Sequence, residues 1–450
     1  MRVHFIAIGG SAMHNLALAL HAKGDVVTGS DDAIFEPSKS RLKNAGILPE
    51  QEGWFDTKIT TELDAVILGM HAKEDNPELI RARELNLKIY SYPEFIYEHS
   101  KNKTRVVIGG SHGKTTITSM ILHVLNYHNV AVDYLVGAQL EGFDRMVNLT
   151  SDNEFIVIEG DEYLSSALDR RPKFHLYQPN IALLSGIAWD HINVFPTFEN
   201  YVEQFKIFIE KMVNGGIMVY NEEDPIVKQI VEEATSPIRK LPYQTPEYSI
   251  DNGITYLHTP EGEMPLEVFG QHNLSNLSGA KWICQNMGID EEDFYEAIAS
   301  FKGAAKRLEK LYDDKSTVVF KDFAHSPSKV KATTEAVKSQ YPNKRIIACL
   351  ELHTYSSLNS DFLTEYKGAL DAATEAIVFY SAEALKIKRM PEISQEQMQA
   401  AFQREGLVTY TNASDFHQFL DQLDLSDAVL LFMSSGDYGG LNLNEYVTKL

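Results

Sequence analysis

A glycine-rich loop between an apolar run and an apolar helical pattern has the residue types that bind nucleoside phosphates. Its residues are Gly110, Ser111, His112, Gly113, Lys114, Thr115 and Thr116. Glycines let backbone N–H groups converge on phosphate oxygens, the lysine neutralises terminal phosphates, and the hydroxyl after the lysine can bind Mg²⁺. The long form of such loops has one more glycine, where this chain has Ile108, so a plain glycine turn with a surface lysine stays the alternative. The loop predicts an ATP site.

Two further groups of ionisable residues come after strand-like apolar runs. The segment 159–162, Glu-Gly-Asp-Glu, follows the run 155–158, and Asp190 and His191 follow the run 181–184. Open α/β sheets bind ligands at the carboxyl ends of their strands. We therefore expect both groups near the ligand-binding edge of a sheet.

The composition indicates an ordinary globular protein of several domains. Its 450 residues exceed one core, and 44% hydrophobic and 23% charged residues do not point to disorder. A net charge of -22 argues against a general nucleic-acid-binding surface. The two cysteines, Cys284 and Cys349, match no metal or disulfide pattern, and no apolar run reaches the length of a membrane span. We expect a cytoplasmic protein without membrane or nucleic-acid partners.

The elements that must position these residues form three α/β domains, predicted at residues 1–100, 101–303 and 304–450. Strands alternate with helical patterns throughout, which indicates mostly parallel sheets. Strands are expected at residues 3–8, 26–28, 65–68, 105–108, 155–158, 181–184, 317–320, 345–350, 376–379 and 429–433. Joints are expected at the basic segment 101–103 and at segment 302–305.

The short motifs, taken in order, resemble those of the Mur ligase family, the three-domain enzymes that build the peptidoglycan peptide. The phosphate loop has the family's shorter form, Gly-x-x-Gly-Lys-Thr-Thr. Segment 159–162 is similar to its acidic motif, with Gly160 where alanine is common, and residues 190–191 resemble its Asp-His motif.

The same likeness extends to both ends of the chain. Segment 8–13 resembles the family's glycine turn for the UDP-sugar, with Ala12 in place of a frequent glycine. Segment 270–276 resembles its adenine-contacting segment, and segments 306–309 and 322–327 match the signals that open its third domain. A lone glycine turn is weak evidence, but the phosphate loop and six further motifs in the family's order are specific.

The resemblance implies a Rossmann-like UDP-sugar domain, a central P-loop ATPase domain and a Rossmann-like domain for the amine substrate. It implies that ATP phosphorylates a carboxylate of UDP-N-acetylmuramate and that an amine then displaces phosphate from the acyl phosphate. Divalent ions and a lysine would offset the repulsion between the two anions. The expected cofactors are ATP and two Mg²⁺ ions.

The same resemblance implies a set of site residues. The catalytic residues would be Lys114, Glu159, Glu162, His191 and Arg307. The ATP site would also contain Gly110, Ser111, His112, Gly113, Thr115, Thr116, Asn273, Asn276, Asp322 and His325. The UDP-sugar site would contain Gly9, Gly10, Ser11, Ala12, Met13, Ser30 and Asp31. Thr115 and Glu159 would hold one metal ion, and His191 a second.

Some of these roles have an ordinary structural alternative. Adjacent acids alternate in direction along a strand, so Asp161 and Glu162 cannot both point inward, and we favour Glu162. Asn273 and Asn276 share a helix face that suits adenine, although Asn273 could simply cap the helix. Arg307 suits a developing phosphate charge but could form a surface ion pair with Glu309.

Two lysines and an arginine carry weaker expectations. Lys206 lies at the spacing from His191 at which some relatives carbamylate a lysine for the second metal, but a solvated helix lysine is the ordinary interpretation. Arg171 and Lys173 could meet an anionic part of the substrate or form a solvated basic turn.

Local residues favour the family branch that joins the tripeptide L-Ala-γ-D-Glu-meso-diaminopimelate to UDP-N-acetylmuramate in peptidoglycan recycling. Tyr163 follows the acidic pair where the alanine-adding branch usually has serine, and segment 169–174 and the 28–31 turn point the same way. Segment 353–355 partly matches the alanine-adding branch, although Thr354 replaces its arginine. L-alanine is therefore the alternative amine.

Other classes of function stay open at this point. The chain could be a nucleotide-binding regulator that has lost the chemistry, or a phosphotransferase, since the loop alone does not distinguish these. We expect a monomer or weak homodimer, and the sequence does not choose between Mg²⁺ and Mn²⁺ or identify the third-position diamino acid.

Overall fold

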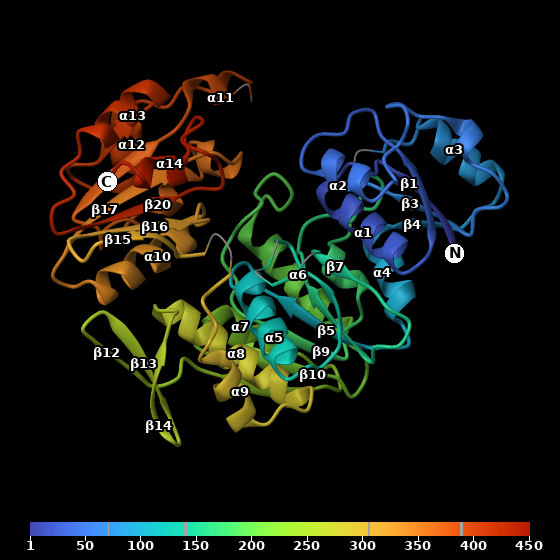
Figure 1. Ribbon diagram of the computed structural model, residues 1–450, viewed down its shortest axis with the longest axis horizontal. Helices are drawn as coiled ribbons and strands as arrows, with labels where there is room; N and C mark the ends of the chain where they lie inside the picture. The colour runs from blue at the N-terminus through green and yellow to red at the C-terminus, as the bar shows by residue number, and fades with distance from the viewer. Residues whose placement is uncertain (71, 139, 141, 144, 305–306, 388–389) are drawn as a thin grey trace. The chain divides into compact units, whose positions relative to one another are not determined.

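The computed structural model describes residues 1–70, 72–138, 140, 142–143, 145–304, 307–387 and 390–450 (Figure 1). It divides into two compact units. The first comprises Met1–Ile187, Val202–Tyr243 and Trp282–Ile289, and the second Ala188–Tyr201, Gln244–Lys281 and Asp290–Leu450. Of the expected joint at 302–305 and the motif at 306–309, Ala305 and Lys306 lie outside the described residues.

The chain begins with a four-stranded parallel sheet in the order β2-β1-β3-β4. Its strands are β1 (Arg2–Ile6), β2 (Val26–Ser30), β3 (Ala65–Leu68) and β4 (Ile89–Ser91). The helices that follow them are α1 (Ser11–Ala22), α2 (Ser38–Asn44), η1 (Asp56–Lys58), α3 (Pro77–Glu84) and α4 (Tyr92–Ser100). The sequence predicted a first strand reaching Ile8, but it ends at Ile6 because Ala7 has a positive φ of 69° and starts the turn into α1.

The second sheet, also in the first unit, has seven strands in the order β11-β10-β9-β5-β8-β6-β7. Its strands are β5 (Thr104–Gly109), β6 (Asp133–Leu135), β7 (Val147–Asn148), β8 (Phe155–Glu159), β9 (Ile181–Leu184), β10 (Ile217–Asn221) and β11 (Arg239–Tyr243). Among the described residues of this sheet, only β6 and β7 pair antiparallel. The accompanying helices are α5 (Lys114–Tyr127), η2 (Lys173–Leu176), α6 (Phe198–Glu210) and α7 (Pro225–Glu233). Residues 106–108, 156–158 and 181–184 are buried, which explains their continuous apolar runs.

The second unit contains two sheets. A small antiparallel sheet, β12-β13-β14, is formed by β12 (Tyr248–Asp251), β13 (Ile254–Thr259) and β14 (Gly262–Leu266). The larger sheet has the order β15-β16-β20-β17-β18-β19, and of its strands in the described ranges only β15 is antiparallel to its neighbour. Its strands are β15 (Glu309–Asp313), β16 (Thr317–Asp322), β17 (Arg345–Glu351), β18 (Glu375–Phe379), β19 (Val408–Tyr410) and β20 (Ala428–Met433).

The remaining helices link or cover these sheets. They are α8 (Gln271–Asn286), α9 (Glu291–Ile298), α10 (Pro327–Gln340), η3 (Ser356–Leu358), η4 (Leu363–Tyr366), α11 (Ala382–Ile387), α12 (Gln395–Phe402), α13 (Ala413–Asp421) and α14 (Leu443–Val447). Helix α8 runs from the second unit into the first.

Alternation along β17 gives the larger sheet two apolar faces. Ile346, Ala348 and Leu350 belong to the core that contains residues of α10 and α12, whereas Ile347 and Cys349 belong to the core that contains residues of α13 and α14. Successive strand side chains point to opposite faces, so a strand buried on both sides reads as one apolar run. Figure 1 shows α10 and α13 on opposite sides of this sheet.

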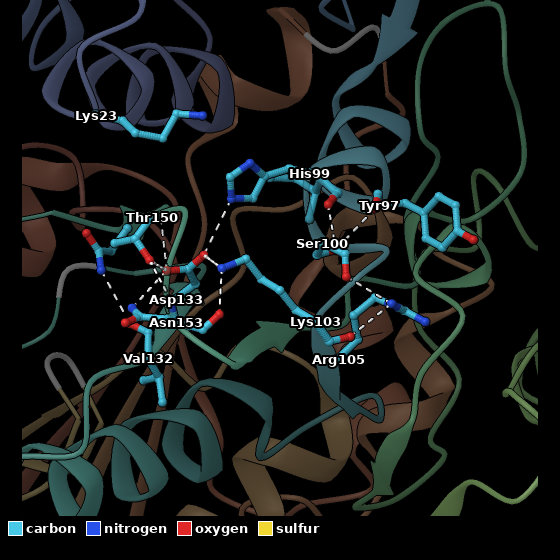
Figure 2. Close-up of polar contacts among 12 residues, drawn as sticks. Lys23, Tyr97, His99, Ser100, Lys103, Arg105, Val132, Asp133, Thr150 and Asn153 are labelled. Atoms are coloured by element: carbon cyan, nitrogen blue, oxygen red, sulfur yellow. Dashed lines mark hydrogen bonds and ion pairs between the residues drawn. The ribbon is translucent and has the colours of Figure 1, made fainter.

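A buried carboxylate ties the end of α4 to the second sheet. Asp133, the first residue of β6, accepts hydrogen bonds from the Thr150 amide at 3.0 Å and hydroxyl at 2.7 Å, and from Asn153 at 2.9 Å. His99 Nε2 on α4 lies 3.4 Å from Asp133 Oδ2, and Lys103 Nζ lies 3.0 Å from it. Figure 2 shows these side chains converging on Asp133. The network fixes the chain as it passes from the first sheet to the second.

The predicted fold class is confirmed: the chain is an α/β protein with mostly parallel sheets. The strands predicted from apolar runs all form, within two residues at each end. Cys284 and Cys349 are both buried free thiols. None of the helices in the described ranges has the length and apolar character needed to cross a membrane.

Candidate active site

The phosphate loop connects β5 to α5 and has little room for side chains. Gly110 has φ of 132°, and a Cβ there would lie 2.2 Å from the Ser185 hydroxyl oxygen. Gly113, the residue before α5, has φ of 79°. Only glycine adopts these two conformations without strain. The loop therefore exposes backbone N–H groups at the start of α5, the geometry that binds anions.

Lys114 folds back across the loop onto an acid from the next motif. Its Nζ lies 2.5 Å from the Gly110 carbonyl oxygen and 2.6 Å from Glu162 Oε2. Both side chains are nearly buried, with 14% of the lysine and 2% of the glutamate exposed. Burial would lower the pKa of Lys114, but the charge and hydrogen bond of Glu162 raise it. Lys114 is therefore a fixed positive charge at the loop.

Thr115 and Glu159 place two oxygen atoms side by side at the carboxyl end of the sheet. The Thr115 hydroxyl donates a hydrogen bond to Glu159 Oε1 at 2.8 Å, and the Gly137 amide donates to Oε2 at 2.8 Å. A Cβ on Gly137 would lie 2.8 Å from Glu159 Oε1, so this glycine permits the close approach. These are hard oxygen ligands of the kind that Mg²⁺ prefers.

The two adjacent acids of the 159–162 motif point to different lysines. Glu162 meets Lys114, whereas Asp161 Oδ2 lies 2.5 Å from Lys173 Nζ and Asp161 Oδ1 accepts a hydrogen bond from the Tyr163 amide. Asp161 therefore holds the loop after β8, and Glu162 is the acid that faces the phosphate loop. Arg171 pairs with Asp169 and Glu94 instead.

The glycine turn predicted for the UDP-sugar connects β1 to α1. The Gly9 amide donates to Asp31 Oδ2 at 2.7 Å, and a Cβ on Gly9 would lie 2.9 Å from the same oxygen. Gly10 precedes α1, while Ser11 and Ala12 are exposed on its first turn and Met13 is buried. Burial raises the pKa of Asp31 to about 6. Ser30 is buried and accepts a hydrogen bond from Lys58.

Asp190 and His191 belong to the second unit, on the segment that follows β9. Asp190 Oδ1 accepts a hydrogen bond from the His191 amide at 2.7 Å, and His191 has a positive φ of 56°. Lys329 Nζ lies 3.8 Å from Asp190 Oδ2. Burial would raise the pKa of Asp190, but Lys329, His191 and His325 lower it. The role of His191 at a second metal stays a prediction.

The residues expected at the nucleotide base open α8, also in the second unit. Asn273 and Asn276 are both buried, and Asn273 Nδ2 donates to the Phe269 carbonyl at 2.9 Å. Gly270, before the helix, has φ of 89°, and a Cβ there would lie 2.5 Å from the Ala336 Cβ. Asn273 thus ties the helix start to the preceding chain by a donated hydrogen bond, whereas an N-cap side chain accepts one. Contact with adenine stays a prediction.

Arg307, Asp322 and His325 lie around the start of the larger sheet. The Arg307 guanidinium stacks on the Phe323 ring at 5.0 Å. Asp322 accepts hydrogen bonds from the Leu308 and Ala324 amides, each at 2.7 Å. Burial lowers the pKa of His325 to about 4, so this ring is neutral at pH 7. These contacts organise the turn after β16 and leave the predicted nucleotide contacts as predictions.

Lys206 has the surroundings of a solvated helix lysine. Its side chain on α6 is 47% exposed, and its Nζ lies 3.9 Å from Glu203 Oε2 one turn earlier. This pairing favours the ordinary interpretation over a carbamate.

The donor set at the loop fits one Mg²⁺ ion. No group of three or more His, Cys, Asp or Glu side chains in the described ranges has a metal-binding arrangement. Mg²⁺ does not need one beside a nucleotide, because it takes one or two protein oxygens together with phosphates and waters. Thr115 and Glu159 supply such oxygens.

The sequence did not reveal two residues that shape the loop. Ser185, directly after β9, donates hydrogen bonds to the carbonyls of His112 and Gly109. Gly137, after β6, orients Glu159. Both follow strands at the same edge of the sheet, and that position was the available signal.

Three family models together match most of the chain. The model described as "Mur ligase family, catalytic domain" matches residues 2–104, "Mur ligase middle domain" matches 108–284, and "Mur ligase, glutamate ligase domain" matches 306–436.

Whole-chain relatives agree with these models. A UDP-N-acetylmuramate–L-alanine ligase of Sulfurihydrogenibium sp. (strain YO3AOP1) is 30% identical and covers 100% of this chain and 98% of its own. One from Clostridium kluyveri (strain NBRC 12016) is also 30% identical, with 99% and 98% covered.

Solved structures share the fold. The Thermotoga maritima UDP-N-acetylmuramate–alanine ligase superposes with a TM-score of 0.69 at 20% identity, with 100% of both chains covered. A murein peptide ligase from Psychrobacter arcticus gives 0.66 at 21% identity, covering 100% of this chain and 98% of its own. The chain therefore belongs to the Mur ligase family, whose members are ADP-forming amide ligases of peptidoglycan synthesis.

Proposed function

We propose that this chain joins an amine to the carboxylate of UDP-N-acetylmuramate, with ATP converted to ADP and phosphate. The observation that supports this most is the arrangement at the carboxyl ends of β5 and β8, where a fixed lysine and a threonine–glutamate oxygen pair face one phosphate loop. In this reaction the γ-phosphoryl group moves to the carboxylate, and the amine nitrogen then displaces phosphate from the acyl carbon.

Each residue at the loop has a role that its geometry suits. Backbone N–H groups of the loop bind phosphate oxygens, and Lys114, held at the loop by Glu162, stabilises the charge on the transferred phosphoryl group. Thr115 and Glu159 would hold Mg²⁺, which supplies charge neutralisation between the two anions when bound. His191 would hold the second ion near the acyl phosphate, through a neutral ring nitrogen.

The first sheet supplies the site for the nucleotide sugar. Asp31 lies at the end of β2, beside the glycine turn after β1. In Rossmann-type sheets an acid at this position hydrogen-bonds ribose hydroxyls, while the glycine turn and helix start bind the pyrophosphate. We assign Gly9, Gly10 and Asp31 to these parts of UDP-N-acetylmuramate.

L-alanine is the first candidate for the amine. Curated relatives that span the whole chain at up to 30% identity are named UDP-N-acetylmuramate–L-alanine ligases. These comparisons favour L-alanine over the tripeptide that local residues indicated.

The tripeptide L-Ala-γ-D-Glu-meso-diaminopimelate is the second candidate, on a specific observation. Lys173 is held by Asp161 and lies 6.0 Å from the Tyr163 ring, the residue that distinguishes this chain from the alanine-adding branch. Thr354 replaces the arginine of that branch. Both changes favour a different amine from L-alanine.

The test measures ADP release and product mass with ATP, MgCl₂ and UDP-N-acetylmuramate, in parallel with L-alanine or the tripeptide. UDP-N-acetylglucosamine, which has no lactyl carboxylate, is the matched acid control, and Lys114→Ala the enzyme control. Amine-dependent ADP release only with UDP-N-acetylmuramate is expected. The amine with the higher kcat/KM identifies the substrate, and no product with either amine contradicts the proposal.

The same assay distinguishes a ligase from a phosphotransferase and from a nucleotide-binding regulator. A phosphotransferase would release a stable phosphorylated product without an amine. A regulator without chemistry would bind ATP but release no ADP, and Lys114→Ala with His191→Ala would leave its biological output intact.

A further inference from the structure

The carboxylate of Asp190 uses its two oxygens for different purposes. Oδ1 accepts the His191 amide at 2.7 Å, and Oδ2 faces Lys329 Nζ at 3.8 Å. His191 has φ of 56°, a conformation that residues with side chains adopt mainly where the surroundings hold it. The orientation of one carboxylate therefore bears on the backbone of the residue that carries the imidazole.

The segment around Asp190 is anchored to the second unit by several further contacts. Trp189 packs edge-on against the Phe362 ring with centroids 6.1 Å apart, and Ile192 packs on the core beneath η3 and η4. Trp189 Nε1 also donates to the Phe195 carbonyl at 3.0 Å. These contacts place the segment against the larger sheet, and Lys329 approaches the Asp190 carboxylate from α10.

Lys329 lies at a position of α10 where a lysine does not stabilise the helix. It is the third residue of α10, in the first turn, where the helix dipole disfavours a cation. Its side chain is 21% exposed, against 59% for Lys331 two residues later, which pairs with Glu335 along the helix. The Lys329–Asp190 pair is thus partly desolvated, and removing one partner of such a pair leaves a poorly solvated charge without its counterion.

We propose that Lys329 is a positioning residue: by facing Asp190 Oδ2 it orients the carboxylate that holds the His191 backbone, and so aims the imidazole. The catalytic consequence rests on the proposed function of His191. The positioning itself does not, because it concerns backbone order in the segment 188–195.

Hydrogen exchange with the full chain tests the positioning directly. Peptides covering residues 188–195 should exchange about tenfold faster in Lys329→Ala, and at the wild-type rate in Lys329→Arg and in the matched control Lys331→Ala. Circular dichroism confirms that each variant is folded. Unchanged exchange in folded Lys329→Ala overturns the proposal.

Kinetics test what the positioning does. We expect kcat to fall about tenfold in Lys329→Ala with KM for ATP unchanged, and to recover in Lys329→Arg. In the double variant with Asp190→Asn the two losses should not add, since both remove the same pair. Additive losses mean that Lys329 acts elsewhere and contradict the proposal.

His191→Ala separates this inference from the proposed function. If His191→Ala keeps full activity, the metal role of His191 fails, while the exchange result still decides the positioning. If His191→Ala is inactive and Lys329→Ala has wild-type kcat, Lys329 does not position His191 for catalysis. The inference then fails while the proposed function stands.

Discussion

Two carboxylate clusters lie at opposite ends of the second sheet, one around the buried Asp133 and one around the partly exposed Glu159. They differ in how many hydrogen-bond donors surround the carboxylate. Asp133, at the amino end of β6, accepts three hydrogen bonds from the segment 150–153 and pairs with His99 and Lys103 (Figure 2). Glu159, at the carboxyl end of β8, accepts one hydroxyl and one amide. Because β6 and β8 run parallel, these ends face opposite directions.

The difference separates structure from function within one sheet. The Asp133 carboxylate is surrounded by donors from α4, the joint at 101–103 and the loop 150–153, so its oxygens are occupied and do not bind a ligand. It fixes the chain between the two sheets. A carboxylate with few partners beside a lysine and a glycine loop can exchange those partners for a metal ion that also binds phosphates. The predictions below test this contrast.

Lys114→Ala should have the largest effect on activity. We expect kcat/KM for ADP release to fall about 10³-fold, because a fixed charge at the phosphoryl group is lost. Lys103→Ala, the lysine of the other cluster, is the matched control and should keep its activity. Comparable activity losses in the two variants would contradict the distinction between a functional Glu159 cluster and a structural Asp133 cluster.

Asp133→Ala should have the largest effect on stability. Removing one partner of a buried ion pair costs about 3 kcal/mol in the free energy of unfolding, measured by urea titration with circular dichroism. The kcat of the folded protein should not change. Asp152 is an exposed acid on the loop that carries Thr150 and Asn153. Asp152→Ala should therefore have the same free energy of unfolding as the wild type.

Thr115→Val should weaken the response to metal while leaving the fold intact. The valine keeps the shape of threonine but removes the hydroxyl beside Glu159, so we expect the Mg²⁺ concentration for half-maximal activity to rise about tenfold. Thr115→Ser should restore it. Equal Mg²⁺ dependence in all three proteins would remove Thr115 from the metal site.

Low pH should reduce the free energy of unfolding by protonating Asp133. Burial would raise the pKa of Asp133, but hydrogen bonds from His99, Thr150 and Lys103 lower it below 3.8. A lowered pKa in the folded state gives stability that is present above the unfolded value and lost as pH falls through the folded one. The urea concentration at the unfolding midpoint of the wild type should therefore decrease as the pH is lowered below about 4. The decrease should be smaller in Asp133→Asn.

Lys206→Ala should have the smallest effect. A half-exposed lysine paired with Glu203 on the same helix contributes little, so activity should stay within about twofold of the wild type. A loss above about tenfold that added acetate partly restores in Lys206→Ala, or that is smaller in Lys206→Glu, would favour the carbamate instead, because a carboxylate can replace the carbamate oxygens.

Sequence reasoning reached furthest where the signal was local. The loop around Lys114 was predicted from residue types and spacing, and the buried strands on either side of it from their apolar runs. The end of the first strand was wrong by two residues, since the left-handed backbone of Ala7 leaves no trace in its residue type. The domain boundaries at 100 and 303 stay predictions.

The sequence by itself determined the α/β fold, the phosphate loop and the family, because apolar periodicity and glycine spacing are properties of neighbouring residues. Tertiary structure decided that Glu162 and not Asp161 faces Lys114, that Gly137 holds Glu159, and that Lys329 faces Asp190. Each of these pairs joins residues distant in the chain, and only the packing of strands and helices sets which side chains meet.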